Sequence, residues 1–184
     1  IRVQSGYSIY KGVGIDVGCG LNKIHSAAIG VDFRMDDKDF GYPFGANIKV
    51  TKNEDCLQLP WFQDKSLDFV FSSHCLEHFS NPEEIIKEIG RLLKPGGYLV
   101  IILPDMRYYP KIGEPGANSD HKCDCYPQVV IEIVYRSASL KIVQLDTLHK
   151  RLKNVTLTHR DQRIASAYGH KSLNFSFDVI CQKF

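Results

Sequence analysis

The sequence predicts a single α/β domain built on a mostly parallel sheet. Short apolar or β-branched runs alternate with at least two helix-like stretches, and this alternation is typical of strand–helix–strand units. The length of 184 residues is that of one domain with one large core. The most apolar run, residues 98–103, has the pattern of a central strand buried on both faces. We therefore expect residues 1–184 to form one domain.

The expected strands are short, apolar or β-branched, and bounded by turn-forming residues. The last of them alternates apolar and polar side chains, and we expect it to pair antiparallel at one end of the sheet. The strands are expected at residues 13–17, 29–33, 48–51, 67–72, 98–103, 140–148 and 173–181.

Two segments have the periodicity of amphipathic helices, residues 81–93 and 127–137. In the first, Asn81 suits the N-cap position and Pro82 the first turn, and residues 94–97 (KPGG) are expected to end the helix. Residues 105–126 are rich in Pro, Gly, Asn and Asp and predict a long loop, which in a compact domain is usually functional.

The composition excludes several classes of protein. A net charge of +2 is too small for a general nucleic-acid binder. No apolar run is long enough to span a membrane, and no secretory leader opens the chain. The six cysteines lack the spacing of a disulfide framework, so we expect reduced thiols and a cytoplasmic protein.

The first predicted strand leads into a turn with two glycines, Gly18 and Gly20, and the acidic Asp16 stands just before it. Glycines let the backbone bend sharply and approach a ligand. A dinucleotide fingerprint would require a third glycine where Lys23 stands, which disfavours a nicotinamide enzyme. Asp32, which closes the second strand, is at the position where a carboxylate can accept hydrogen bonds from the hydroxyls of a ribose.

Taken in order, four segments resemble the class I S-adenosylmethionine-dependent methyltransferases, in particular type 11-like members with a short first helix. The resemblance covers residues 13–105. It is carried by GIDVGCG (14–20), IGVDFR (29–34), DCLQLPWFQDKSLDFVFSSHCLEHF (55–79) and EIGRLLKPGGYLVIILPD (88–105).

The resemblance implies a Rossmann-like fold with a seven-stranded, mostly parallel sheet. The implied strand order is 3-2-1-4-5-7-6, with helices on both faces in three α/β/α layers. It also implies S-adenosylmethionine as cofactor. The residues that would bind it are Asp16, Gly18, Cys19 and Gly20 near the methionine and ribose, Asp32 and Phe33 at the ribose, Asp55, Cys56 and Leu57 at the adenine, and Ser73 and His74 near the methyl group.

The sequence departs from the family pattern at two places. The segment between the glycines and Asp32 leaves room for only a stub of the first helix, and Asn22 replaces the usual third glycine. Few residues precede the first strand, so we expect the N-terminal helices that often cover the acceptor to be absent from this chain. The acceptor would then be recognised by residues 105–126, by residues 149–171, by a missing N-terminal region, or by a second subunit in a homodimer or with a partner.

Methyl transfer to a hydroxyl is helped by a general base. His74 is the first candidate because it falls just past the fourth strand, and Asp105 and His121 come next. His78 is expected instead to fix the loop or cap a helix. The residues at 73–76 are Ser-His-Cys-Leu rather than the Asn-Pro-Pro-Tyr type motif of methyltransferases that act on amino groups of bases or glutamine. This disfavours N-methylation of that kind. The stretch from Gly113 to Tyr126 also resembles the loop after the fifth strand in bacterial methyltransferases of glycan or surface-polysaccharide pathways, so we expect transfer to oxygen of a small molecule or glycan.

Other features leave alternatives open. The sequence HKCDC (121–125) contains residue types that bind zinc. Its cysteines are closer together in the sequence than those of structural zinc sites, so we expect no metal. Tyr108 and Tyr109 could stack on an acceptor or lie at the edge of the core. The basic residues 149–171 suit a solvated loop better than an anion site. A cofactor-binding module without catalysis is the main alternative function, and a nucleotide-dependent oxidoreductase is a distant third.

Overall fold

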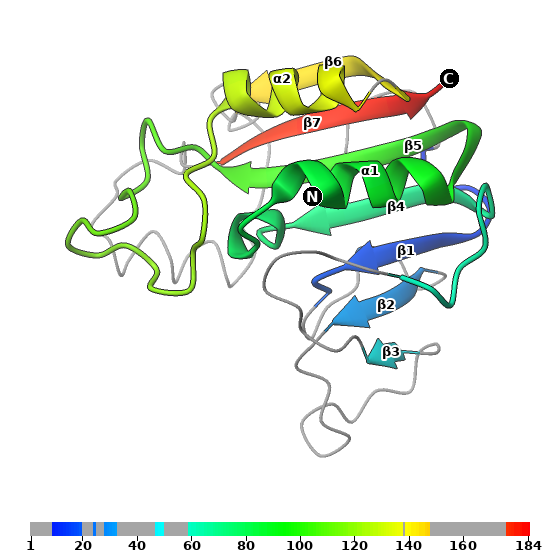
Figure 1. The fold of residues 1–184 in the computed structure, drawn as a ribbon, viewed down its shortest axis with the longest axis horizontal. Coiled ribbons are helices and arrows are strands. Elements are labelled where there is room, and N and C mark those ends of the chain that lie inside the picture. The colour runs from blue at the N-terminus through cyan, green and yellow to red at the C-terminus, as the bar shows by residue number, and fades with distance from the viewer. Residues whose placement is uncertain are drawn as a thin grey trace.

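The computed structural model describes residues 9–19, 24, 28–32, 47–49, 59–137, 139–147 and 176–184. They form a seven-stranded sheet in the order β3-β2-β1-β4-β5-β7-β6 (Figure 1). This is the strand order that the resemblance to class I methyltransferases implies. The strands are β1 (Gly14–Val17), β2 (Ile29–Asp32), β3 (Asn47–Lys49), β4 (Leu67–Ser73), β5 (Leu93–Pro104), β6 (Leu140–Thr147) and β7 (Ser176–Lys183).

Strands β1 to β5 run parallel, and β7 runs antiparallel to both of its neighbours, β5 and β6. The predicted antiparallel strand is therefore confirmed, but its place differs from the expectation. It lies one strand in from the end of the sheet, because β6 forms the edge. Here β7 is covered on both sides by hydrogen-bonded neighbours, which agrees with its six buried residues from Ser176 to Cys181.

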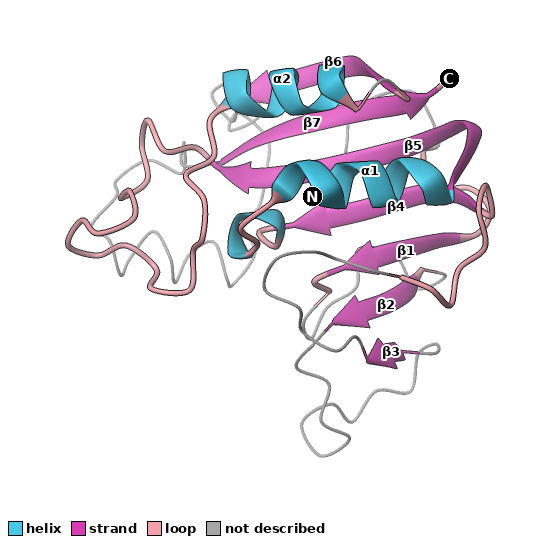
Figure 2. Ribbon diagram, viewed as in Figure 1, coloured by secondary structure: helices cyan, strands magenta, loops and turns pink. Residues whose placement is uncertain are grey.

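The helices of the described part are α1 (Pro82–Leu92), α2 (Pro127–Arg136) and the short 3-10 helix η1 (Leu76–His78). Helices α1 and α2 lie on the same face of the sheet (Figure 2). Their isoleucines and valines pack with the apolar side chains of β1, β4 and β5 in one core. On the opposite face Phe71, Val100, Ile102 and Ile180 pack with Ile9. The described residues do not test the prediction that helices also cover this face of the sheet.

Helix α1 begins where the sequence predicted. The side-chain oxygen of Asn81 accepts a hydrogen bond from the amide of Glu84, and Pro82 occupies the first turn. Four apolar side chains spaced along one side of the helix are completely buried. Burial of such a stripe, rather than helix propensity alone, holds a helix of this length in place. The buried stripe consists of Ile85, Ile86, Ile89 and Leu92.

Helix α1 ends at Leu92, just before the residues 94–97 that were predicted to stop it. The predicted start of the next strand at residue 98 is wrong, because β5 already begins at Leu93, which pairs with Leu67. Pro95 cannot continue a helix, but it is tolerated near the beginning of a strand. A Cβ at Gly97 would lie 2.9 Å from the carbonyl oxygen of Lys94 and 3.0 Å from that of Asp68. Only glycine therefore lets the chain pass this close to β4.

The remaining elements agree with the sequence where they are described. Helix α2 and strand β6 occupy the predicted positions, and residues 105–126 form a loop without helix or strand. The basic segment 149–171 lies outside the described residues. None of the helices in the described part of the chain has the length and apolar character of a membrane span.

Candidate functional site

The carboxyl ends of β1, β2, β4 and β5 meet at one edge of the sheet, because these strands run parallel. Ligands of open α/β sheets bind beyond this edge. The segments that follow the four strands carry most of the residues that the sequence singled out. The described ones among them are Asp16, Gly18, Cys19, Asp32, Ser73, His74, Asp105 and His121.

The turn after β1 is held tightly between its two neighbours. Gly18 has a φ of 73°, a conformation that side chains other than glycine rarely adopt. Its amide donates a hydrogen bond to the carbonyl oxygen of Val31 at 2.8 Å. A Cβ at Gly18 would lie 2.5 Å from the Cβ of Cys75. The turn is therefore closed against β2 on one side and against the segment after β4 on the other.

The two acidic residues lie close to this turn. Val17 pairs with Val31 across β1 and β2, so the next residues along the two strands are Gly18 and Asp32. The carboxylate of Asp16 is buried and accepts a hydrogen bond from the amide of Ile24 at 2.6 Å. Burial, and after it the charges of Glu77, Asp32 and Asp16, raise the pKa of the Cys75 thiol. The structure therefore brings the glycine turn and both carboxylates into one small region.

Five of the predicted cofactor residues cannot be placed. Gly20, Phe33, Asp55, Cys56 and Leu57 lie outside the described residues. Their assignment remains a prediction. Cys19 is described and buried, and its amide lies 3.5 Å from the carbonyl oxygen of Val31.

His74 is held by contacts from three directions. Its amide donates to the carbonyl oxygen of Ile102, and its Nε2 lies 3.0 Å from the hydroxyl oxygen of Ser176. Its Nδ1 lies 3.5 Å from a carboxylate oxygen of Glu77. With a φ of 51°, His74 also has a left-handed backbone, which residues other than glycine adopt mainly in turns and at functional sites. Strand β5, strand β7 and helix η1 thus hold His74 and its imidazole ring in position.

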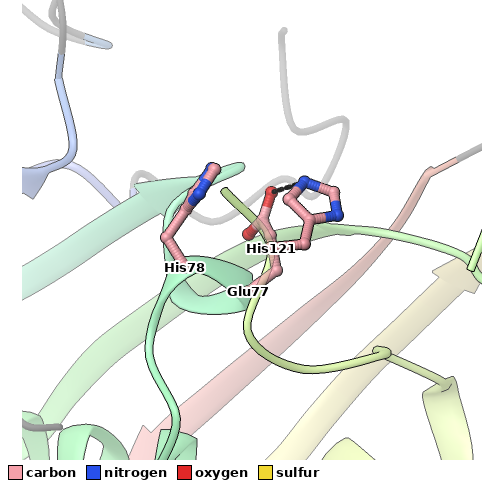
Figure 3. Close-up of side chains that lie close together, drawn as sticks. All are labelled: Glu77, His78 and His121. Atoms are coloured by element: carbon pink, nitrogen blue, oxygen red, sulfur yellow. Dashed lines mark ion pairs between the residues drawn. The ribbon is translucent and has the colours of Figure 1, made fainter. Parts of the chain in front are cut away.

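Glu77 is the most deeply buried acid at this edge. Its side chain is 1% exposed, and besides His74 it faces His121, whose Nε2 lies 3.9 Å from the same carboxylate oxygen (Figure 3). Burial by itself would raise the pKa of Glu77, but the neighbouring His74 and His78 outweigh burial and lower that pKa. Burial lowers the pKa of His121, against the opposing charge of Glu77. The structure therefore favours an anionic carboxylate beside neutral His121.

The loop after β5 is tied to η1 by its backbone. The amides of Lys122 and Cys123 both donate to the carbonyl oxygen of Glu77, at 2.8 and 3.2 Å. Nδ1 of His78 lies 3.1 Å from the carbonyl oxygen of Asp120. The expectation that His78 fixes the loop agrees with this contact.

Asp105 does not present a free carboxylate. It is 1% exposed, and its two oxygens receive hydrogen bonds from the backbone amide, Nε and Nη2 of Arg107, at 2.6 to 3.1 Å. An ion pair with two parallel hydrogen bonds holds a carboxylate firmly in one orientation. This arrangement favours a role in shaping the loop after β5 over proton transfer.

The two tyrosines of the loop differ. Tyr108 is 44% exposed and lies under the guanidinium of Arg107, whereas Tyr109 is buried with its ring 5.5 Å from that of His121. Only Tyr108 is therefore accessible for stacking. The thiols of Cys123 and Cys125 lie 3.5 Å apart. The hydrogen bond between them lowers the pKa of Cys123 and raises that of Cys125.

Sequence reasoning missed Glu77 and Ser176. The position of Glu77 between Leu76 and His78, directly after a strand, was the available signal. No local signal could have found Ser176, since it reaches His74 only through the antiparallel return of β7, 102 residues further along the chain.

Comparison with known proteins agrees with this geometry. The family model described as a methyltransferase domain matches residues 15–101. A malonyl-[acyl-carrier protein] O-methyltransferase of a Marinomonas species is 29% identical over 103 residues, which is 56% of this chain and 37% of that protein. This chain spans less than half the length of the curated relatives that it matches.

Solved structures share the fold over almost the whole chain. An S-adenosylmethionine-dependent methyltransferase from Mesorhizobium loti aligns with a TM-score of 0.63 at 16% identity, over 92% of this chain and 89% of that one. A Haloferax volcanii protein solved in complex with the Trm112 methyltransferase activator aligns with a TM-score of 0.59 at 17% identity, over 92% and 81% of the two chains. The chain therefore has the fold of these proteins, and its residues 15–101 are similar to a methyltransferase domain.

Proposed function

We propose that the protein transfers the methyl group of S-adenosylmethionine to a hydroxyl oxygen of a small molecule or glycan. One observation supports this most directly. The Gly18 turn, the Asp32 position and the imidazole of His74 all lie at the same edge of the sheet. An adenosyl ligand at the first two would place its reactive end toward the third.

The described residues fit this cofactor. The absence of a side chain at Gly18 makes room for Cys75 and allows the left-handed backbone of the turn, and the carboxylate of Asp32 can accept hydrogen bonds from both ribose hydroxyls. Asp16 supports the same segment through its hydrogen bond to Ile24. We propose that Cys19 and Gly20 line the methionine and ribose, Phe33 the ribose, Asp55, Cys56 and Leu57 the adenine, and Ser73 the methyl group.

The proposed role of His74 is to take the proton of the acceptor hydroxyl. The cofactor supplies a methyl group that is already activated by its positively charged sulfur, so the protein contributes chiefly position and orientation. Nε2 of His74 would hold the proton, beside the hydroxyl of Ser176. The carboxylate of Glu77 lies on the other side of the ring, 3.5 Å from Nδ1. His121 and Asp105 are weaker candidates, because His121 is buried and Asp105 is paired with Arg107.

Three observations support the proposed acceptor. The Ser-His-Cys-Leu sequence after β4 lacks the motif of methyltransferases that act on amino groups of bases or glutamine. A curated relative is an O-methyltransferase. The exposed ring of Tyr108, on the loop after β5, offers a stacking surface for a sugar. The five free thiols found in the described part suit a reducing cytoplasm.

The main alternative is a cofactor-binding module that acts through another subunit. A structural neighbour solved together with an activator protein keeps this alternative open. The two functions differ in one measurable respect. Both bind S-adenosylhomocysteine, but only the enzyme transfers the methyl group without a partner.

The test is transfer of a tritiated methyl group from S-adenosylmethionine into extracts of metabolites and glycans. We expect label in base-stable, oxygen-linked products with the wild-type protein. The variant His74→Ala should lose about a hundred-fold or more of the rate, as expected for removal of a general base, with binding of S-adenosylhomocysteine retained. The exposed acid Glu132 on α2 provides the control variant Glu132→Gln, which should behave as wild type. Absence of transfer by a protein that binds S-adenosylhomocysteine would favour the module.

A further inference from the structure

Three side chains with metal-ligand chemistry converge beyond the ends of β4 and β5. Glu77 and His78 come from η1 and His121 from the loop after β5, and one ligand atom of each lies within 4.8 Å of the others (Figure 3). We call this group the histidine–carboxylate cluster. None of its three residues is among those to which the cofactor is assigned.

The carboxylate of Glu77 lacks the hydrogen bonds that a buried anion requires. Its side chain is 1% exposed, and neither oxygen accepts a hydrogen bond from the described part of the chain. The nearest ring nitrogens, on His74 and His121, lie 3.5 and 3.9 Å away. Burial of an ionised carboxylate without such bonds is costly, so it usually marks a bound ion or water.

The hydrogen bond of His78 leaves its other nitrogen suited to bind a metal. A carbonyl oxygen only accepts, so Nδ1 of His78 carries the hydrogen in its contact with Asp120 at 3.1 Å. The lone pair is then on Nε2. Metal-binding histidines commonly have their second nitrogen fixed in this way by a backbone carbonyl. The rings of His78 and His121 lie edge to face, 5.0 Å apart.

We propose that Glu77, His78 and His121 bind a divalent transition-metal ion of the zinc class. Two imidazoles and one carboxylate form a donor set that is common for such ions, and it leaves a coordination position open for a further oxygen ligand. Bonds of about 2.0 to 2.2 Å would draw the widest ligand pair together by roughly 1 to 1.5 Å. The hydrogen bonds from Lys122 and Cys123 to the carbonyl oxygen of Glu77 already join the two segments that must close.

The position of the cluster suggests what the open position would bind. It lies on the segments after β4 and β5, next to His74, where the acceptor is proposed to sit. A metal there would bind the acceptor hydroxyl and lower its pKa. This second statement rests on the proposed function, whereas the metal site does not.

The experiment is calorimetric titration of the full chain, freed of metal by chelation, with zinc in the absence of cofactor and acceptor. We expect one zinc ion per chain. The variants His78→Ala, His121→Ala and Glu77→Gln should each weaken binding by about a hundred-fold or more, beyond the effect known for residues that only support ligands. Glu114→Gln is the matched control, because Glu114 is an exposed acid on the same loop. It should bind zinc as tightly as the wild type.

Two further measurements distinguish the ligands and the fold. Cobalt absorption of the wild-type protein should show the bands of nitrogen and oxygen ligands without thiolate charge transfer. Thiolate bands, or loss of zinc in Cys123→Ser with retention in His121→Ala, would overturn the proposal in favour of the cysteine pair. Equal zinc affinity of the wild type and all three cluster variants would also overturn it. Binding of S-adenosylhomocysteine, measured on each variant, shows separately whether the fold and the cofactor site remain intact.

Discussion

The backbone amide of Gly18 donates a hydrogen bond to the carbonyl oxygen of Val31, at 2.8 Å, directly before Asp32. This one contact closes the turn after β1 onto the end of β2. It depends on a left-handed backbone at Gly18 and on the space between the turn and Cys75. The cofactor assignment therefore depends on a turn that tolerates no side chain.

We expect Gly18→Ala to destabilise the protein more than the matched substitution Gly113→Ala. Both glycines have a positive φ, at 73° and 86°, and the strained backbone costs about 1 to 2 kcal/mol in each. At Gly113 an added Cβ would meet no atom within 4 Å, whereas at Gly18 it would overlap Cys75. The overlap adds about 1 to 3 kcal/mol. Urea unfolding measures the difference, and equal losses in the two variants would contradict the described turn.

The pair of Asp105 and Arg107 provides a second prediction. In Arg107→Met the carboxylate of Asp105 would remain buried without its partner, and we expect a loss of about 2 to 4 kcal/mol in the free energy of unfolding. Arg136→Met removes a more exposed ion pair, with Glu83, and should change stability little. Thermal unfolding of the two variants tests this. Similar melting temperatures for both would mean that Asp105 is held in some other way.

A pH dependence of stability is expected from Glu88. Hydrogen bonds from Arg91, and with them one from the amide of Leu59, hold the pKa of Glu88 below its ordinary value of 4.5 although partial burial opposes the shift. Because the pKa is lower in the folded state, the contribution to stability is complete above pH 4.5 and is lost as the pH falls through the folded value.

The variant Glu88→Gln should therefore be about 1 to 2 kcal/mol less stable than the wild type at neutral pH. The difference should shrink as the pH falls below 4.5. Guanidinium unfolding across this range measures it, with Glu132→Gln on α2 as the exposed control. A difference that stays constant with pH would show that the charge of Glu88 does not contribute.

The order of the strands could be predicted because four segments resemble a known family, and the start of α1 could be predicted because its signals are local. Asn81, Pro82 and the spaced isoleucines specify the helix within one short segment. The start of β5 could not, since its course at Gly97 depends on the close approach of Lys94 and Asp68. A sequence pattern indicates which residues form turns and which are buried. It does not indicate which strand lies beside them.

In the candidate site, too, local features could be predicted and contacts between distant segments could not. The glycine turn and Asp32 stand at strand ends, so their common edge could be predicted. The contacts of His74 with Ser176 and of Glu77 with His121 join segments that are 102 and 44 residues apart. They depend on the antiparallel return of β7 and on the path of the loop after β5. The prediction that no metal binds was based on the spacing of the cysteines within residues 121–125. That spacing carries no information about the contacts of Glu77 with His121.

The central claim is that the Gly18 turn and Asp32 bind one adenosyl ligand. Calorimetric titration with S-adenosylhomocysteine tests it most directly, on the wild type, on Asp32→Asn and on the control Glu132→Gln. We expect the wild type and the control to bind equally, and Asp32→Asn to bind about 10- to 100-fold more weakly, as loss of hydrogen bonds to a charged group predicts. Wild-type protein that binds no S-adenosylhomocysteine, or an Asp32→Asn variant that binds it as tightly as the wild type, would contradict the claim.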